Sequence, residues 1–149
     1  MKLNRDQADL IFRALFCSIF VGLGGEHLFH DDLIRRLMPA WVPMQRLVSA
    51  LCGLWLITWG GMLLLGWRIQ LAAKALALFL VAVTLVVHAP GVMMKALNIP
   101  EADYWMWEIL QRSNLVKNLC LLGVCLQLHF HQLGKYSLEE YVKRRRDER

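Results

Sequence analysis

Residues Leu47 to Gly66, LVSALCGLWLITWGGMLLLG, and residues Ala75 to Met94, ALALFLVAVTLVVHAPGVMM, are two uninterrupted runs of 20 residues without a charged side chain. At about 1.5 Å per residue, a helix of this length spans about 30 Å, the thickness of a bilayer's hydrocarbon core. The chain has 149 residues, of which 57% are hydrophobic, so it has too little polar sequence to enclose two such helices in a water-soluble shell. The sequence therefore predicts an integral membrane protein.

Two weaker apolar segments flank this pair. Residues 8–29 contain Arg13 near their start and Glu26 near their end, and residues 112–133 contain Lys117 in an early turn. Each segment can span a membrane only if its charged side chains snorkel to the interface. We therefore expect an all-α fold, an integral membrane four-helix bundle in residues 1–134 with helices over about 8–29, 47–66, 71–94 and 112–133, and a basic cytoplasmic tail in residues 135–149.

The basic residues are distributed unequally between the two sides that these four helices define. Ten lie on the side of both termini, namely Lys2, Arg5, Arg68, Lys74, Lys135, Lys143, Arg144, Arg145, Arg146 and Arg149, and six lie on the other, namely Arg35, Arg36, Arg46, Lys95, Arg112 and Lys117. Because basic loops are retained in the cytoplasm, we expect a multi-pass protein with both termini cytoplasmic. The net charge of +5 is accompanied by no nucleic-acid-binding module, so we expect the tail to contact lipid headgroups and not nucleic acid.

Several polar residues should share one depth near the outer face of the predicted bundle. They come from the end of the first helix, the third helix and the start of the fourth, and they are Glu26, His27, His30, His88, Lys117 and Asn118. As a ligand-binding set, Glu26, His27, His88, Lys117 and Asn118 could hydrogen-bond a quinone carbonyl or a small anion. As a metal site, the candidates are Glu26, His27, His30 and His88. The alternative is that these side chains face water and headgroups, with His88 hydrogen-bonded inside the bundle.

His129 and His131 lie near the cytoplasmic end of the fourth predicted helix. Their i, i+2 spacing places them on different helix faces, and they are best interpreted as an interfacial pair. A haem held by two histidines would need a second ligand at the same depth, and the sequence offers none. We therefore do not expect haem, while a quinone stays the favoured cofactor and a metal the less favoured one.

The four cysteines contain no Cys-x-x-Cys pair and are Cys17, Cys52, Cys120 and Cys125. Cys120 and Cys125 lie about 140° apart around a helix, so they cannot form a disulfide within it. We expect small apolar packing residues, with a link between Cys52 and Cys120 as the alternative.

Two outer segments could cover the mouth of the bundle. Residues 39–43 place Pro39 and Pro43 around Trp41, and the prolines stiffen that loop. Residues 101–110 form a second, amphipathic stretch. Together they could form a lid, and ordinary interfacial loops are the alternative.

An ordered set of short features runs along about four-fifths of the chain. The set consists of Phe20-Val21-Gly22-Leu23-Gly24-Gly25, Pro39-Ala40-Trp41-Val42-Pro43, the glycine-rich segment 47–66, His88, Tyr104-Trp105, and Lys117-Asn118-Leu119-Cys120-Leu121-Leu122-Gly123. In this order it resembles the DoxX-like (DoxX/DoxD) superfamily of small four-helix integral membrane proteins.

The resemblance implies a bacterial inner-membrane protein with both termini inside. Members of this superfamily include a membrane subunit linked to thiosulfate oxidation with quinone as acceptor, subunits of oxidative-stress complexes, and distant relatives that act as assembly chaperones or cargo receptors. The resemblance implies that His88, Lys117 and Asn118 match functional positions of the family's motifs. This chain departs from the family pattern because Ala89-Pro90-Gly91 follows the histidine and the aromatic pair comes later.

Three functions remain open on these grounds. The first is an accessory subunit of a redox or quinone-linked membrane system, with His88 and Lys117 contacting the ligand. The second is a non-enzymatic factor for membrane-protein assembly or interaction, with a membrane or redox protein partner or a second copy of the chain. The third is metal handling. No nucleophile-base pair, phosphate loop or dinucleotide fingerprint is present, so we expect no autonomous enzyme; an active protein would be a membrane oxidoreductase subunit.

Overall fold

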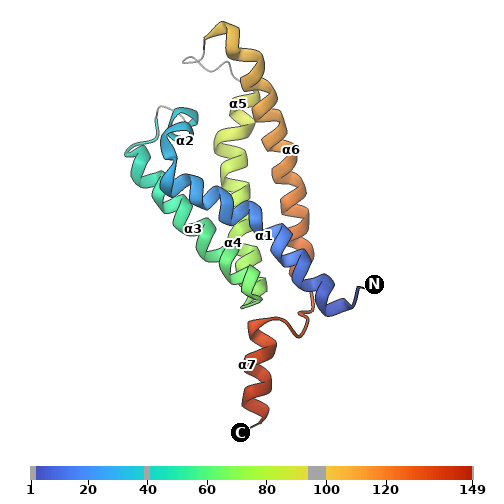
Figure 1. Ribbon diagram of the computed structural model, residues 1–149. Coiled ribbons are helices and arrows are strands. Elements are labelled where there is room, and N and C mark those ends of the chain that lie inside the picture. Colours follow the sequence, from blue (N-terminus) through green and yellow to red (C-terminus); the bar gives the residue numbers. More distant parts are fainter. Residues whose placement is uncertain (1–2, 39–40, 94–99, 149) are drawn as a thin grey trace.

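The computed structural model describes residues 3–38, 41–93 and 100–148, and this part of the chain contains helices and no strand (Figure 1). The elements are α1 Arg5–Phe29, α2 Asp31–Leu37, α3 Gln45–Leu65, α4 Ile69–Val83, the π-helical turn η1 Thr84–His88, α5 Ala89–Met93, the 3₁₀ turn η2 Glu101–Asp103, α6 Tyr104–Leu128 and α7 Leu138–Asp147. The all-α prediction is confirmed for these residues. Some residues of these predictions lie outside the described residues: Pro39 and Ala40 of the outer loop, Met94, and Lys2, Lys95 and Arg149 of the basic-residue count.

Among the described residues, three helices are long and apolar enough to cross a membrane. They are Arg5–Phe29, Gln45–Leu65 and the continuous run Ile69–Met93, and an 18-residue stretch of each has a mean hydropathy of 1.6, 1.8 and 2.2, respectively. Their bounds lie within three residues of the predicted 8–29, 47–66 and 71–94. α1 begins earlier than predicted because Asn4 and Gln7 form a capping box, in which each side chain accepts a hydrogen bond from the other residue's backbone N–H.

The fourth predicted helix differs most from the structure. α6 covers Tyr104–Leu128 and not 112–133. Most of the predicted lid segment 101–110 is therefore the beginning of α6, and His129 and His131 follow the helix instead of lying on it. Because the first half of α6 carries Glu108 and Arg112, its 25 residues are not among the helices apolar enough to span by composition.

α1 and α3 pack closely through glycine. A Cβ atom on Gly53 would lie 2.8 Å from the Gly24 carbonyl oxygen, and one on Gly24 would lie 3.0 Å from the Gly53 carbonyl oxygen. No side chain fits there, as expected for small residues that let membrane helices approach. α3 in turn packs on α4, and α4 packs on α6.

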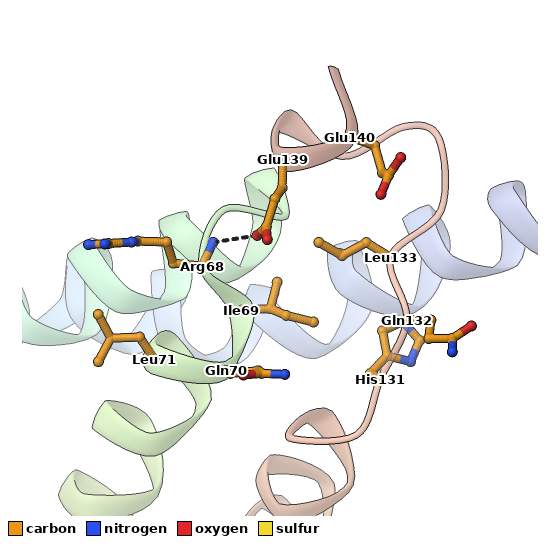
Figure 2. Close-up of a pocket in the computed structure, with 9 residues that line it drawn as sticks. All are labelled: Arg68, Ile69, Gln70, Leu71, His131, Gln132, Leu133, Glu139 and Glu140. Atoms are coloured by element: carbon orange, nitrogen blue, oxygen red, sulfur yellow. Dashed lines mark hydrogen bonds between the residues drawn. The ribbon is translucent and has the colours of Figure 1, made fainter. Parts of the chain in front are cut away.

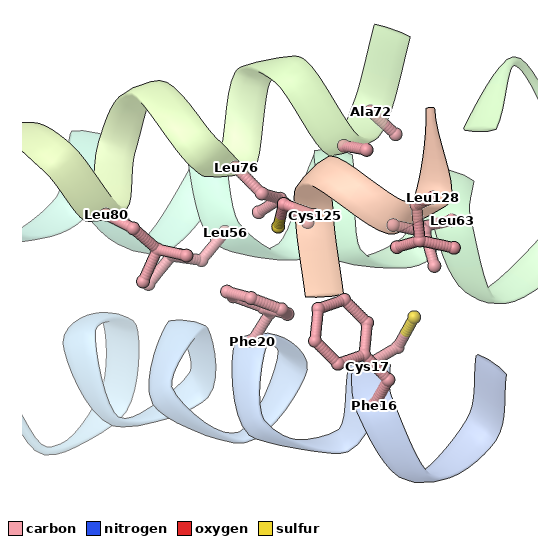
Figure 3. Packing of buried hydrophobic residues seen from close by; sticks show 11 residues of the cluster. Phe16, Cys17, Phe20, Leu56, Leu63, Ala72, Leu76, Leu80, Cys125 and Leu128 are labelled. Carbon is pink, nitrogen blue, oxygen red and sulfur yellow. The ribbon is translucent and has the colours of Figure 1, made fainter. Parts of the chain in front are cut away.

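Side chains from all four long helices meet in one apolar core (Figure 3). The core consists of Phe16, Cys17, Phe20, Leu56, Leu63, Ala72, Ala73, Leu76, Leu80, Cys125 and Leu128. All four cysteines are free thiols, and the two in the core agree with the packing role predicted for them. Large apolar side chains also cover the outer surface, among them Leu15, Leu51, Leu54, Leu78, Leu85, Leu119 and Leu126. This surface suits contact with lipid.

The two ends of the molecule differ in what they bring together (Figure 1). At one end, which we call the α7 end, the start of α1, the α3–α4 turn and the segment after α6 meet. Arg5 donates a hydrogen bond to Gln132 over 3.0 Å, and Lys135 pairs with Asp6 over 3.6 Å, which ties the start of the described chain to its last segment. At the opposite end, Figure 1 shows the end of α1 and α2 separated from α5 and the start of α6.

Candidate functional site

The predicted outer cluster is divided between two helix pairs. On the first pair, His27 of α1 faces α3, where its Nδ1 lies 3.1 Å from the hydroxyl oxygen of Ser49. Ser49 is fully buried and donates its single hydrogen to the His27 carbonyl oxygen over 3.1 Å. His27 Nδ1 is therefore the donor to that hydroxyl. This arrangement joins α1 to α3 and turns His27 away from the other predicted residues.

Glu26 and His30 remain on the surface of α1. Their side chains are 59% and 76% exposed and lie 3.9 Å apart as an i, i+4 pair. In the part of the chain that the structure describes, no group of three or more His, Cys, Asp or Glu side chains could hold a metal ion. The structure thus does not bring the predicted metal candidates Glu26, His27, His30 and His88 together, because they face different neighbours.

On the second pair, polar side chains join the α4–η1 helix to α6. The α4–α6 seam, as we call Thr84, His88, Gln111 and Asn118, contains two hydrogen bonds. The Asn118 amide donates to the Thr84 hydroxyl over 3.1 Å, and His88 Nδ1 lies 2.7 Å from Gln111 Oε1. Because Oε1 can only accept, Nδ1 is the donor, and neutral His88 keeps an acceptor lone pair on Nε2.

The π-helical turn η1 aligns this seam. Thr84 is its first residue and His88 its last, so both ends of the turn bond to α6. Pro90 lies two residues after His88 and has no N–H to donate to the carbonyl four residues before it, which favours a break in the regular helical hydrogen bonding. Such turns are frequent at functional sites.

Gly91, part of the departure from the family pattern, makes room for Gln111. A Cβ atom on Gly91 would lie 2.8 Å from Gln111 Cδ, and Trp107 donates its indole N–H to the Gly91 carbonyl oxygen over 3.2 Å. Lys117 donates to Asn114 over 2.7 Å. Of the predicted ligand set, His88 and Asn118 lie on the seam, Lys117 precedes Asn118 in α6, and Glu26 and His27 lie on the other helix pair.

Sequence analysis missed a second polar assembly, at the α7 end. Arg13 is fully buried, instead of snorkelling to the interface as predicted, and its Nε donates to Asp9 Oδ2 over 3.1 Å. Its other two nitrogens donate to backbone carbonyls, to Tyr136 over 2.9 Å and to Leu64. All three guanidinium nitrogens are satisfied inside the protein, as a buried arginine requires.

Asp9 is the centre of this assembly. It is 6% exposed and also contacts His131, whose Nε2 lies 2.6 Å from Oδ1, and it accepts the Gly134 backbone N–H over 3.2 Å. The i, i+4 spacing of Asp9 and Arg13 is a signal that the sequence contains. The contact with His131 spans 122 residues, and no local pattern indicates it.

The residues after 134 form more than a basic tail. Ser137 caps α7, the Glu139 backbone N–H donates to the Gly66 carbonyl over 3.2 Å, and the Glu139 carboxylate accepts the Arg68 backbone N–H over 3.1 Å. Gly66 has φ +66°, and a Cβ atom there would lie 2.6 Å from Ser137 Cβ. Glycine at this turn is what allows α7 to dock.

A cavity of about 670 Å³ lies between these elements (Figure 2). Its lining comes from the α3–α4 turn and the start of α4, the segment after α6, and the start of α7, and it consists of Arg68, Ile69, Gln70, Leu71, His131, Gln132, Leu133, Glu139 and Glu140. His131 therefore both contacts Asp9 and lines the cavity.

Comparisons of the chain with protein-family models, with curated proteins and with solved structures find no match. The resemblance to the DoxX-like superfamily therefore stays a prediction.

Proposed function

We propose that this chain is a multi-pass membrane protein of the DoxX-like type, in the inner membrane of a bacterium and with both termini in the cytoplasm. α1, α3, the continuous α4–η1–α5 helix and α6 would be its four crossings. The apolar lengths of the first three and the leucine-rich outer surface support this proposal. An even number of crossings agrees with the hydrogen bond and ion pair that join the start of α1 to the segment after α6.

Within that membrane we propose an accessory role in a redox or quinone-linked system, without autonomous catalysis. The observation that carries this proposal is the state of His88, whose Nδ1 donates to the buried amide of Gln111. Nε2 is then an acceptor, suited to the hydroxyl of a quinol. The ammonium of Lys117 uses one hydrogen on Asn114 and has others to offer a quinone carbonyl.

The test is quinol binding by the purified chain in lipid nanodiscs, with ubiquinol and menaquinol as probes. His88→Ala should raise the dissociation constant about tenfold, which corresponds to about 1.4 kcal/mol. His30→Ala is the matched control, because it removes an exposed imidazole from the other helix pair. Equal binding by the wild type and His88→Ala, with both proteins folded, would reject the quinone role.

A non-enzymatic assembly or interaction factor is the second candidate. α7 favours it, because Leu138, Tyr141 and Val142 recur at i, i+3 and i+4 and are exposed, with side chains 40%, 52% and 39% accessible. A stoichiometric protein partner in native mass spectra after gentle extraction, lost in a Leu138→Ser, Tyr141→Ser and Val142→Ser triple variant, would support this role. A chain recovered alone, or bound only to copies of itself, would count against a different protein as partner.

A further inference from the structure

The cavity at the α7 end lies apart from the α4–α6 seam and presents mainly hydrogen-bond acceptors. Figure 2 shows the side chains of Glu139 and Glu140 on the α7 side, with Gln70 and His131 on the opposite side. The side chain of Arg68, the one permanently cationic group of the lining, extends away from them. The polar walls therefore carry carboxylate groups without a guanidinium between them.

These carboxylates are not neutralised within the protein. In the described residues, neither Glu139 nor Glu140 forms an ion pair with Lys, Arg or His. Glu139 accepts one backbone N–H, that of Arg68, through Oε2 over 3.1 Å. A carboxylate has about four lone-pair sites, so both groups keep capacity to accept hydrogen bonds from a ligand.

His131 lines the cavity, and the buried assembly holds it in place. Its Nε2 lies 2.6 Å from Oδ1 of Asp9, and Asp9 is itself fixed by Arg13 and the Gly134 backbone. An ionised carboxylate can only accept, so Nε2 donates to it. This contact fixes one wall of the cavity independently of the acidic residues of α7.

Apart from Gln132, the remaining lining is apolar and consists of Ile69, Leu71 and Leu133. Figure 2 shows Ile69 and Leu133 between the α7 carboxylates and Gln70. Such a wall suits methylene groups, while the acceptors around it suit a cation that donates several hydrogen bonds.

We propose that this cavity binds an alkylammonium group, with Glu140 and Glu139 as its charge partners and the side-chain oxygen of Gln70 as a further hydrogen-bond acceptor. Two sources share this chemistry: the ethanolamine headgroup of a phospholipid and a free di- or polyamine. The site is independent of the proposed quinol site, since it shares no residue with the seam.

The experiment uses the full chain in nanodiscs of phosphatidylcholine, with putrescine as the free amine and calorimetry as the readout. In a second arm, native mass spectrometry measures retained phosphatidylethanolamine from mixed-lipid nanodiscs. Putrescine binding alone identifies a free amine as the ligand, retention of phosphatidylethanolamine alone identifies the lipid, and either result supports the proposal. Binding in neither arm overturns it.

Variants test whether this cavity is the site. Glu140→Gln should weaken binding at least tenfold, whereas Glu148→Gln, which removes a carboxylate beyond the same helix, should leave it unchanged. Gln70→Leu is a second variant on α4, in case the α7 substitution alters folding, and it should also weaken binding. Equal affinity in Glu140→Gln and Gln70→Leu overturns the assignment.

A competitor tests the hydrogen-bond argument separately. Tetramethylammonium has the same charge and no N–H donor, so it should displace putrescine poorly. Displacement at equal concentrations would overturn recognition of the ammonium by acceptors and leave only nonspecific charge attraction.

Discussion

Asp9→Asn is the substitution that should most severely weaken the fold at the α7 end. It keeps the shape of the side chain and removes one charge from the centre of a buried assembly. Arg13 is fully buried and would lose its anionic partner, which lies 3.1 Å away. His131 would lose a charged acceptor 2.6 Å from its Nε2. The one side-chain oxygen left at position 9 could then accept from Arg13 or from His131 but not from both, and the buried guanidinium would have no anionic partner.

The loss of stability expected for Asp9→Asn follows from this geometry. Removing one partner of a buried ion pair costs about 3–5 kcal/mol, because the remaining charge stays buried without compensation. We expect about 3 kcal/mol, at the low end of that range, because Tyr136 beside Arg13 is exposed and lets water approach. Glu108→Gln is the matched control: it breaks an exposed i, i+4 pair with Arg112, which is worth about 0.3–0.5 kcal/mol.

The assay is the free energy of unfolding in lipid-detergent micelles, measured by helical circular dichroism against denaturant. A double variant, Asp9→Leu with Arg13→Met, should be less destabilised than the sum of the two single variants, because it leaves no unpaired charge. If Asp9→Asn lowers stability no more than Glu108→Gln does, or if the two single effects simply add, the reasoning about this assembly is wrong.

Three further predictions concern the α1–α3 contact, the docking of α7 and the seam, and each is tested by the free energy of unfolding, with proteolysis added for α7. Gly53→Ala should destabilise the α1–α3 contact by about 1–3 kcal/mol through overpacking, whereas Gly61→Ala, with open space around its Cβ position, should be neutral or stabilising; the opposite order would contradict the close approach. Gly66→Ala should lower stability and increase proteolysis of the α7 segment, because of its positive φ and the neighbouring side chain; unchanged proteolysis would show that α7 does not dock there. Gln111→Leu should cost about 1–3 kcal/mol by leaving the His88 donor unsatisfied, and a neutral result would mean that this bond does not hold the seam.

The apolar helices were predictable because the signal is local. The length of a run of 20 uncharged residues predicts the length of its helix without knowledge of the rest of the fold. α3 and the Ile69–Met93 helix accordingly begin within two residues of the predicted starts. α6 was placed wrongly because its first half is polar, and hydropathy cannot reveal a helix that contains Glu108 and Arg112. The capping box of α1 and the break before Pro90 are also local features, because each depends on residues that are close together in the sequence.

The candidate site was only partly predictable. Depth along the helices placed His88 and Asn118 on two helices that are neighbours in the structure, where both take part in hydrogen bonds of the α4–α6 seam. The same argument wrongly added His27, because equal depth does not say which helix a side chain faces; His27 faces Ser49 of α3.

The sequence by itself determined that this chain is helical, where its apolar helices lie and which residues can carry charge or donate hydrogen bonds. These properties depend on residues close together in the chain. The tertiary structure alone decided that Asp9 meets His131 across 122 residues, that α7 docks on Gly66, and that the outer polar residues separate into two groups. Such contacts depend on how the faces of packed helices are oriented toward each other, and closely packed neighbours settle that orientation together.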